Sequence, residues 1–310
     1  MTEISVVIPV YGCEACLIAL HQRLTESLKN LVSEYEIIFV DDCGKDNSWY
    51  ILEDIAKQDH YVKVFRLSRN FGQHAAITAG LSQSLGNWVV VMDCDLQDPP
   101  ENIPYLYEEA MKGFDIVLAK RKEKQHSGFR KLAAKLYFKI LNFFSKSNLD
   151  GDYGSFSMIS RKVVNSFLSI KDLERHYLLI LQWLGFRTTS IEYKHGERYS
   201  GKSSYSLSNL INHALEGIFF QTTRLLRWII YAGFFISSLG FLLSIYYIWQ
   251  YFLHGSLPGW TSLAVLILIM SGFIIISIGV TGMYIGKIFE QVKERPLFII
   301  DQKIINGVKE

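Results

Sequence analysis

The sequence predicts an α/β fold: a Rossmann-like, mainly parallel sheet in a cytoplasmic domain, followed by a two-helix transmembrane hairpin. Two observations support this expectation. Short apolar runs alternate with helical patterns from the amino terminus onward, and the stretch from Trp228 to Gly286 contains no Lys, Arg, Asp or Glu. Alternating strands and helices build a parallel sheet that is covered on both faces. So long an uncharged apolar stretch is rare in a soluble core and typical of helices that span a membrane.

The expected strands are short runs of apolar, β-favouring residues that end in turn-forming residues. They lie at Ile4–Val10, Glu36–Val40, Val62–Leu67, Trp88–Met92 and Ile116–Ala119. Helices with apolar residues at helical spacing are expected between them, near Glu14–Val32, Asn47–Lys57, His74–Leu85 and Asn102–Lys112. Two further strands are expected at Phe156–Ser160 and Thr189–Tyr193, so that the sheet domain occupies residues 1–205.

The uncharged stretch holds two apolar segments, residues 228–252 and 263–285, and each is long enough to cross a bilayer. Basic residues flank the pair of segments: Arg224, Arg227, Lys287, Lys293 and Arg295. The connecting turn contains no Lys or Arg. The positive-inside rule therefore places both termini and the sheet domain in the cytoplasm. We expect an amphipathic helix at residues 206–227, the hairpin at 228–286 and a cytoplasmic tail at 287–310.

Composition narrows the possible partners and cofactors. The formal net charge is only +2, which gives no electrostatic reason to expect a nucleic-acid partner. The four cysteines lie in the part expected in the cytoplasm, where thiols are kept reduced. We therefore expect free thiols and disfavour a redox role for Cys13-x-x-Cys16. Zinc is disfavoured because no second Cys/His pair is suitably spaced.

The most informative motif is the buried strand Trp88–Met92, which ends abruptly in Asp93, Asp95 and Asp98. Ligands of open α/β sheets bind at the carboxyl ends of the strands. Carboxylates two residues apart at such an end can share a hard cation such as Mg²⁺ or Mn²⁺, whose other ligands usually come from phosphates and water. The alternative interpretation is an acidic turn between a strand and a helix.

The first two strands end in similar polar turns, Pro9-Val10-Tyr11 and Asp41-Asp42, and parallel strands bring these ends to one edge with Asp93 and Asp95. Acids suit ribose hydroxyls, base N–H groups and a bridging metal, so the pattern predicts a nucleotide bound through metal and sugar. The sequence contains neither G-x-G-x-x-G after the first strand nor G-x-x-x-x-G-K-[ST], which disfavours a dinucleotide enzyme and a P-loop NTPase.

Two amphipathic segments lie near the hairpin in the sequence. Apolar residues recur at helical spacing from Phe129 to Phe144, beside basic residues that include Arg130, Lys131 and Lys135. A second such pattern runs from Leu207 to Phe219. An apolar helix face bordered by Lys and Arg favours contact with an anionic membrane surface. Ordinary packing against the sheet domain is the alternative for either helix.

Six strings, taken in their order and spacing, resemble the family 2 glycosyltransferases of the polyprenyl-phosphate type. They are ISVVIPVY (4–11), Asp41-Asp42, RNFGQHAAITAGL (69–81), DCDLQDPPE (93–101), RYSGKSSYSL (198–207) and KERPLFII (293–300). That family includes dolichol-phosphate mannose synthases and bacterial undecaprenyl-phosphate glycosyltransferases with a carboxyl-terminal two-helix anchor. The resemblance covers nearly the whole chain. It implies a GT-A domain that uses a nucleotide sugar, a polyprenyl phosphate, and Mg²⁺ or Mn²⁺ at the bacterial inner membrane.

The resemblance also implies roles for individual residues. The nucleotide would contact Pro9, Tyr11, Asp41, Asp42 and Asp93. The metal would be held by Asp93, Asp95 and Gln97. The acceptor phosphate and lipid would lie near Arg121, Arg130, Lys131, Lys135, Arg198 and Ser203. The catalytic residues would be Asp95 and Asp152, although Asp152 could equally be a structural cap at a turn.

The chain departs from the common family pattern at several positions. Gly12-Cys13-Glu14 stands where many relatives carry an Asn and acids, and Cys43-Gly44 follows the double acid in place of Gly-Ser. Asp152-Tyr153-Gly154 looks more like the mannose-synthase and aminoarabinose-transferring branches than the glucosyl branch. These departures leave the sugar open.

The expected reaction is inverting transfer of a sugar to a phosphate oxygen. A phosphate monoester has its second pKa near ~6, so the acceptor is mostly dianionic at neutral pH and a strong general base is optional. Two rivals from other classes are a processive membrane polysaccharide synthase and a non-enzymatic scaffold or lipid-flipping subunit. The first would be expected to show Q-x-x-R-W and more spans. The second would need a polar pathway, which uncharged spans do not offer. Association into a homo-oligomer through the hairpins is possible, since Gly272, Gly279, Gly282 and Gly286 permit close helix approach.

Overall fold

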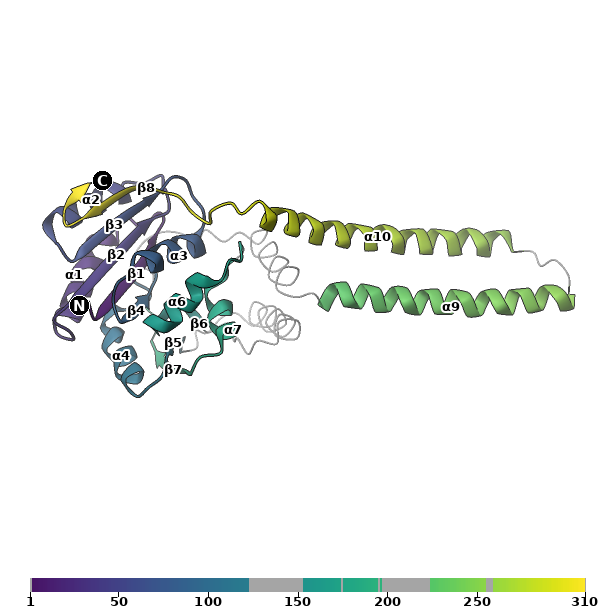
Figure 1. Ribbon diagram of the computed structural model, residues 1–310, viewed down its shortest axis with the longest axis horizontal. Helices are drawn as coiled ribbons and strands as arrows, with labels where there is room; N and C mark the ends of the chain where they lie inside the picture. The colour runs from purple at the N-terminus through teal and green to yellow at the C-terminus, as the bar shows by residue number, and fades with distance from the viewer. Residues whose placement is uncertain are drawn as a thin grey trace. The chain divides into compact units, whose positions relative to one another are not determined.

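The computed structural model describes residues 2–122, 153–173, 175–194, 196, 224–254 and 259–309. These residues fall into two compact units (Figure 1). The sheet unit contains the described residues up to 122, those of 153–196 and those from Pro296 onward, and the helical unit contains 224–295.

A nine-stranded sheet forms the centre of the sheet unit, with the strand order β7-β5-β6-β4-β1-β2-β3-β8-β9. The strands are β1 Ile4–Val10, β2 Tyr35–Asp41, β3 Val62–Leu67, β4 Trp88–Val91, β5 Ile116–Arg121, β6 Tyr153–Ser160, β7 Thr188–Tyr193, β8 Ile300–Ile305 and β9 Val308–Lys309. The helices are α1 Leu17–Lys29, α2 Ser48–Gln58, α3 Gln73–Gln83, α4 Ile103–Met111, α6 Arg161–Ser169 and α7 Tyr177–Leu184, with a 3₁₀ turn η1 at Pro100–Asn102.

Helices cover both faces of the sheet because its central strands are apolar on both faces. All seven residues of β1 and all seven of β2 are buried. Ile4, Val6 and Ile8 contribute to a core that α1, α2 and α4 cover. Val7, on the opposite face of the same strand, contributes to a second core beneath α3, α6 and α7. The strands and helices expected in the first 120 residues are confirmed, with ends that shift by a few residues.

The sheet is mixed, which corrects the expectation of a mainly parallel sheet. Strands β1 to β4 are parallel, and β5 is parallel to β7. However, β6 lies antiparallel between β4 and β5, and β8 lies antiparallel beside β3. The alternation of strands and helices in the sequence stops after α4, and this is where the parallel pattern ends.

The carboxyl-terminal residues correct the predicted division of the chain. The tail expected at residues 287–310 is not one separate segment, because its last part enters the sheet. Strand β8 pairs with β3 from Val64↔Ile304 to Leu67↔Ile300, and the side chain of Ile304 is 1% exposed. The chain therefore returns to the sheet unit after the apolar helices and covers an edge that would otherwise be open.

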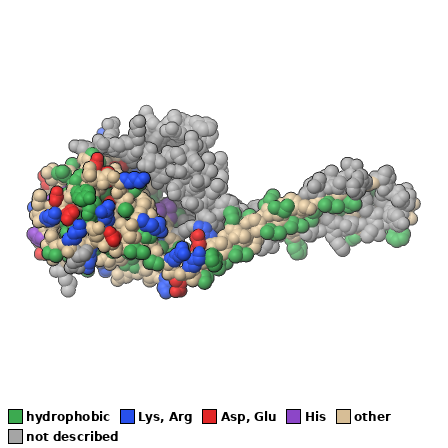
Figure 2. Space-filling model, turned by 90° about the horizontal axis from the view of Figure 1, so that it is seen from above, with side chains coloured by type: hydrophobic (Ala, Val, Ile, Leu, Met, Phe, Trp, Pro, Cys, Tyr) green, Lys and Arg blue, Asp and Glu red, His purple; other side chains and the backbone are tan. Residues whose placement is uncertain are grey.

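The helical unit contains two long helices, α9 Arg224–His254 and α10 Trp260–Val292, which run side by side in opposite directions (Figure 1). Among the side chains that the structure describes, one segment is long and apolar enough to cross a membrane. This segment is Met270–Val292. Its mean hydropathy is 1.7, and its apolar side chains are not buried inside the protein. Figure 2 shows hydrophobic and uncharged side chains along this helical rod. Its Lys and Glu residues lie in the last turns, as the ion pair of Lys287 with Glu290 illustrates.

Several predicted residues lie outside the described part of the chain. They are the catalytic candidate Asp152 and the acceptor candidates Arg130, Lys131, Lys135, Arg198 and Ser203, together with both amphipathic segments. Their roles stay predictions from the sequence.

Candidate active site

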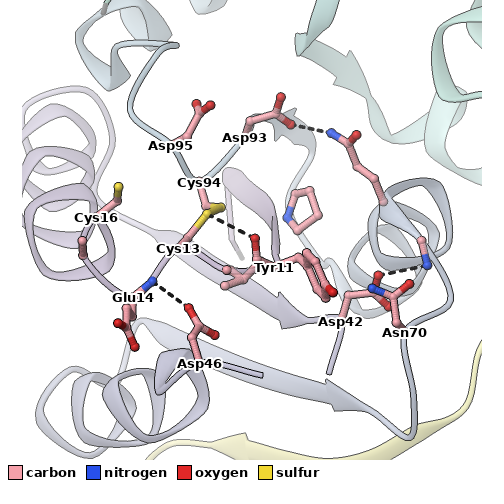
Figure 3. Close-up of a pocket in the computed structure, with 16 residues that line it drawn as sticks. Tyr11, Cys13, Glu14, Cys16, Asp42, Asp46, Asn70, Asp93, Cys94 and Asp95 are labelled. Carbon is pink, nitrogen blue, oxygen red and sulfur yellow. Dashed lines mark hydrogen bonds between the residues drawn. A yellow bond between two sulfur atoms is a disulfide. The ribbon is translucent and has the colours of Figure 1, made fainter. Parts of the chain in front are cut away.

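A cavity of about 500 Å³ lies at the carboxyl ends of β1, β2 and β4 (Figure 3). These three strands are neighbours in the sheet, so the segments that follow them meet at one edge. The cavity is lined by five of the predicted site residues, Pro9, Tyr11, Asp42, Asp93 and Asp95. The expectation that the polar strand ends gather at one edge is therefore confirmed.

Asp93 is held in the cavity by two side-chain hydrogen bonds. Its Oδ1 accepts a hydrogen bond from Gln73 Nε2 at 2.7 Å and another from Ser155 Oγ at 2.7 Å. Burial, and next the negative charge of Asp98, raise the pKa of Asp93 to about 6. The ionised form of Asp93 is thus destabilised mainly by loss of contact with water and next by the nearby negative charge of Asp98.

Asp95 lies two residues further along a tight turn. The backbone N–H of Gln97 donates to Asp95 Oδ1 at 3.1 Å, and Leu96 between them has a φ of +60°. Non-glycine residues rarely adopt this left-handed conformation, and those that do are often found at functional sites. The Gln97 side chain is half-buried and does not line the cavity, whereas its carbonyl accepts the N–H of Gly196 at 2.8 Å.

Asp42 lines the cavity wall opposite Asp93 and organises the loop before α3 (Figure 3). Its two carboxylate oxygens accept the backbone N–H groups of Phe71 at 2.7 Å and Gly72 at 2.9 Å. Gly72 has a φ of +95°, which favours glycine, and the next residue, Gln73, reaches Asp93. The string RNFGQH therefore connects two of the predicted acids through one loop. Burial raises the pKa of Asp42, and these two backbone hydrogen bonds oppose the effect.

Asp41 is placed differently from Asp42. Its carboxylate is 1% exposed, lies 3.2 Å from Arg66 Nε and accepts the N–H of Gly44 at 3.3 Å. Burial raises the pKa of Asp41, and next the hydrogen bond from Gly44 opposes this shift. Because Asp41 does not line the cavity, the geometry favours Asp42 over Asp41 for a contact with a ligand.

A disulfide joins Cys13 to Cys94, with 6.3 Å between their Cα atoms. The expectation that all four cysteines are free thiols is therefore wrong for these two, whereas Cys16 and Cys43 are not disulfide-bonded. The physical reason is that β1 and β4 are neighbouring parallel strands, so the turns after them lie within bonding distance. Cys94 stands between the two acids of the D-C-D motif, and the bond thus ties the metal-type motif to the loop after β1 (Figure 3).

Arg121 lies at the end of β5, opposite Tyr193 of β7. Its Nε donates to the Tyr193 hydroxyl at 3.3 Å, and its Nη2 is 3.9 Å from Asp98 Oδ1. The Tyr193 hydroxyl also donates to Asp98 Oδ1. Although burial would lower the pKa of Arg121, the charge of Asp98 and next the Tyr193 hydroxyl raise it overall. Arg121 therefore stays a cation near Asp93 and Asp98.

The oxygen ligands of the cavity fit a hard divalent cation. No group of three or more His, Cys, Asp or Glu side chains suited to metal is found within the described residues. Asp93 and Asp95 thus offer two carboxylates, and Mg²⁺ typically binds proteins through one or two carboxylates while phosphates and water complete its shell. Burial raises the pKa of Asp93, and a bound cation would oppose this shift.

Sequence reasoning missed the residues that hold the acids in place. Gln73 and Ser155 donate to Asp93, Asp46 accepts the N–H of Glu14 at 3.1 Å, and Tyr193 donates to Asp98. Gln73 could have been found, because it follows a glycine at the start of a helix after the third strand. The other contacts join segments that are far apart in the sequence, and no local pattern announces them.

Fold and site together define a glycosyltransferase of the GT-A class, with its crevice at the carboxyl ends of parallel strands. The glucosyl-3-phosphoglycerate synthase of Mycobacterium tuberculosis, solved with Mn²⁺, UDP and phosphoglyceric acid, shares this fold. The two align with a TM-score of 0.52 and 18% identity over 70% of this chain and 76% of that chain.

The chain belongs to glycosyl transferase family 2, whose sequence pattern matches residues 5–168. It is 36% identical to the undecaprenyl-phosphate 4-deoxy-4-formamido-L-arabinose transferase of Proteus mirabilis, over 100% of this chain and 95% of that protein. It is also 36% identical to the SfII prophage-derived bactoprenol glucosyl transferase of Shigella flexneri, over 96% of this chain and 97% of that protein.

Proposed function

We propose that the chain transfers a sugar, with inversion, from a UDP- or GDP-linked donor to a polyprenyl phosphate, undecaprenyl phosphate in particular. The product would be a polyprenyl-phosphate-linked sugar for modification of cell-envelope glycans such as lipopolysaccharide. The observation that supports this most is the cavity that brings Asp42, Asp93 and Asp95 together at the strand ends. Relatives of nearly the same length that carry polyprenyl-phosphate transferase names support the acceptor class.

The donor would lie in the cavity at the ends of β1, β2 and β4. Pro9, Tyr11 and Asp42 line the cavity, whose volume of about 500 Å³ leaves room for a nucleoside. Tyr11 is 52% exposed, so its ring is available to a base. Asp93 and Asp95 would hold Mg²⁺ or Mn²⁺; Gln97, the third predicted ligand, does not line the cavity. When bound, such an ion supplies positive charge that stabilises the departing nucleoside diphosphate.

The acceptor phosphate would approach Arg121, the predicted acceptor contact that lies among the described residues. Two anions must come together during transfer, so a fixed cation at the meeting point has an electrostatic role. A planar guanidinium is well suited to a phosphate because it donates two parallel hydrogen bonds. The phosphate dianion is itself a nucleophile, and Asp152 would therefore act as a helpful rather than an obligatory base.

We further propose that α9 and α10 form a two-pass anchor in the bacterial inner membrane, with the sheet unit and both termini in the cytoplasm. The apolar, uncharged segment of α10 supports this location. The carboxyl-terminal strand β8 supports a shared side for both termini, because it pairs with β3 in the same sheet as the amino-terminal strand β1.

The test is a transfer assay with the full chain in membranes or detergent. The enzyme is incubated with undecaprenyl phosphate, Mn²⁺ or Mg²⁺, and a panel of radiolabelled UDP- and GDP-sugars. A chloroform-soluble, acid-labile product with one donor supports the proposal. A labelled polymer would point to a processive synthase, and no incorporation from any donor would point to a scaffold.

A further inference from the structure

Arg121 is the predicted contact of the acceptor phosphate that lies among the described residues. An arginine side chain is long and flexible. Holding a long side chain in one geometry costs rotamer entropy, so a useful guanidinium must be fixed by its surroundings. Three contacts from three different segments meet at Arg121: Tyr193 at the end of β7, Asp98 in the turn after β4, and Gly154 at the start of β6.

Tyr193 is held rigidly behind Arg121. Its side chain is 3% exposed, and its ring packs edge-on against the buried Phe156 with 5.6 Å between centroids. Burial, and next the charge of Asp98, raise the pKa of Tyr193, so the hydroxyl keeps its proton and donates a hydrogen bond to Asp98. The oxygen then accepts from Arg121 Nε at 3.3 Å. The hydroxyl thus connects the carboxylate to the guanidinium.

Gly154 limits the other side of the guanidinium. A Cβ at this position would lie 2.5 Å from Arg121 Nη2 and 3.0 Å from Cζ, so any side chain here would force the guanidinium to shift. The absence of a side chain lets the Arg121 guanidinium lie directly against the β6 backbone. The next residue, Ser155, donates to Asp93 at 2.7 Å, so Arg121 is fixed one residue away from the contact that holds a predicted metal ligand.

These contacts leave part of the guanidinium available. Nε is used by Tyr193, and Nη2 lies 3.9 Å from Asp98, beyond normal hydrogen-bond length. Nη1 has no hydrogen-bond partner among the described residues, and the Arg121 side chain remains 32% exposed. An ion pair that served only to join β5, β7 and the turn would be expected to direct its donors at the carboxylate.

We propose that Tyr193 and Asp98 are positioning residues that aim Arg121 at the phosphate of the acceptor, beside Asp93. This inference rests on the proposed function, whose acceptor is a phosphate monoester. Tyr193 fixes the plane of the guanidinium through Nε, Asp98 fixes Tyr193 and balances the charge of Arg121 while the site is empty, and Gly154 provides the space.

The test uses the full chain in detergent and one deletion of a single atom. Tyr193→Phe removes the hydroxyl but keeps the ring against Phe156. Tyr177→Phe is the matched control, because Tyr177 is also buried, at 1% exposed, and its hydroxyl lies 2.9 Å from Ser157 Oγ rather than beside Arg121. Binding of farnesyl phosphate, a soluble prenyl phosphate, is measured by calorimetry, with farnesol as the probe that lacks phosphate. Binding of UDP with Mn²⁺ is measured in parallel.

Tyr193→Phe is expected to weaken farnesyl phosphate binding and to raise the acceptor KM by about tenfold, while kcat changes less than about threefold and UDP binding stays unchanged. Arg121→Lys, which keeps the charge but loses the fork, is expected to give a similar loss. Gly154→Ala is expected to weaken the acceptor in the same way by displacing the guanidinium. Tyr177→Phe should change none of these values.

The inference is overturned if Tyr193→Phe leaves farnesyl phosphate binding unchanged, or if UDP binding alone weakens, which would assign Arg121 to the donor. It is also overturned if the wild-type chain binds farnesol as well as farnesyl phosphate. The proposed function is tested by a separate measurement, the transfer of sugar from a donor. Phosphate-dependent binding that Tyr193→Phe weakens, without transfer from any donor, would retain the positioning role and reject the transferase activity.

Discussion

The sheet unit and the helical unit treat the same apolar residue types in opposite ways. Every residue of β1 is buried within the sheet unit, whereas the apolar segment of α10 is not buried inside the protein. Ile8 is 0% exposed and Ile276 is 64% exposed. The first unit satisfies its apolar residues by folding and keeps its carboxylates at the strand ends. The second leaves its apolar surface to its surroundings and carries no charge over most of its length. The first unit therefore carries the proposed active site, and the second carries the proposed membrane anchor.

The largest expected effect is on the rate of sugar transfer, without a change in where the protein is located. Asp95→Ala should lower transfer about a hundredfold or more, because a metal clamp on the leaving group supplies several kcal/mol and each 1.4 kcal/mol or so is tenfold in rate. The fraction of protein in the membrane should not change. Asp54→Ala is the control, since the Asp54 side chain is 73% exposed on α2 and does not line the cavity. Near-normal turnover of Asp95→Ala with Mn²⁺ present would remove the metal assignment.

A matched pair of substitutions tests the contrast in burial. Ile8→Asn should destabilise the sheet unit by about 3–5 kcal/mol, because it leaves a cavity and an unsatisfied amide in the core. Ile276→Asn should leave the melting of the sheet unit unchanged, since this side chain is mostly exposed. Thermal unfolding of the detergent-purified variants, read through UDP-dependent stabilisation, reports on the sheet unit. Equal losses from both variants would mean that α10 packs as a soluble core helix does.

The disulfide offers a third difference, because all four cysteines lie in the sheet unit. Cys13 and Cys94 are 81 residues apart, and a bond that closes so long a loop typically contributes 2–4 kcal/mol, or about 4 by chain entropy. Dithiothreitol should therefore lower the melting temperature of the wild-type sheet unit and leave the far-ultraviolet signal of the long helices unchanged. The double variant Cys13→Ser, Cys94→Ser should melt low with or without the reductant. Equal melting of the reduced and oxidised protein would show that the bond does not form in solution.

The smallest expected effect lies where the chain rejoins the sheet. Ile304→Ala should cost about 2 kcal/mol, because this side chain is 1% exposed, although β8 lies near the margin of the sheet, between β3 and the two-residue edge strand β9. Val308→Ala is the control, since Val308 is 61% exposed in β9. Differential scanning calorimetry of the two variants would decide. If both are neutral, β8 does not form part of the folded sheet unit.

The local parts of the fold could be predicted from the sequence. Strands β1 to β5 and helices α1 to α4 follow from apolar runs and helical spacing, which are properties of short windows. The gathering of Asp42, Asp93 and Asp95 also followed, because parallel neighbours place their carboxyl ends at one edge. Helices α6 and α7 were not predicted, although Val163, Val164 and Phe167 are buried at helical spacing.

The partners of the acids could not be predicted. Asp42 holds a loop that begins 29 residues later, and Tyr193 donates to a carboxylate 95 residues away. Such pairs depend on which strands become neighbours, and strand order is not written in any short window. The same reason explains why Cys13–Cys94 contradicted an expectation based on compartment alone.

By itself, then, the amino-acid sequence determined which residues form strands, which turns carry carboxylates and which stretch lacks charge, because each is a local pattern of polarity. The tertiary structure alone decided that β6 runs antiparallel between β4 and β5, that β8 returns to pair with β3, and that Tyr193 and Asp98 meet at Arg121. These choices join distant segments, and they depend on the free energy of packing the whole sheet unit rather than on the preference of any one segment.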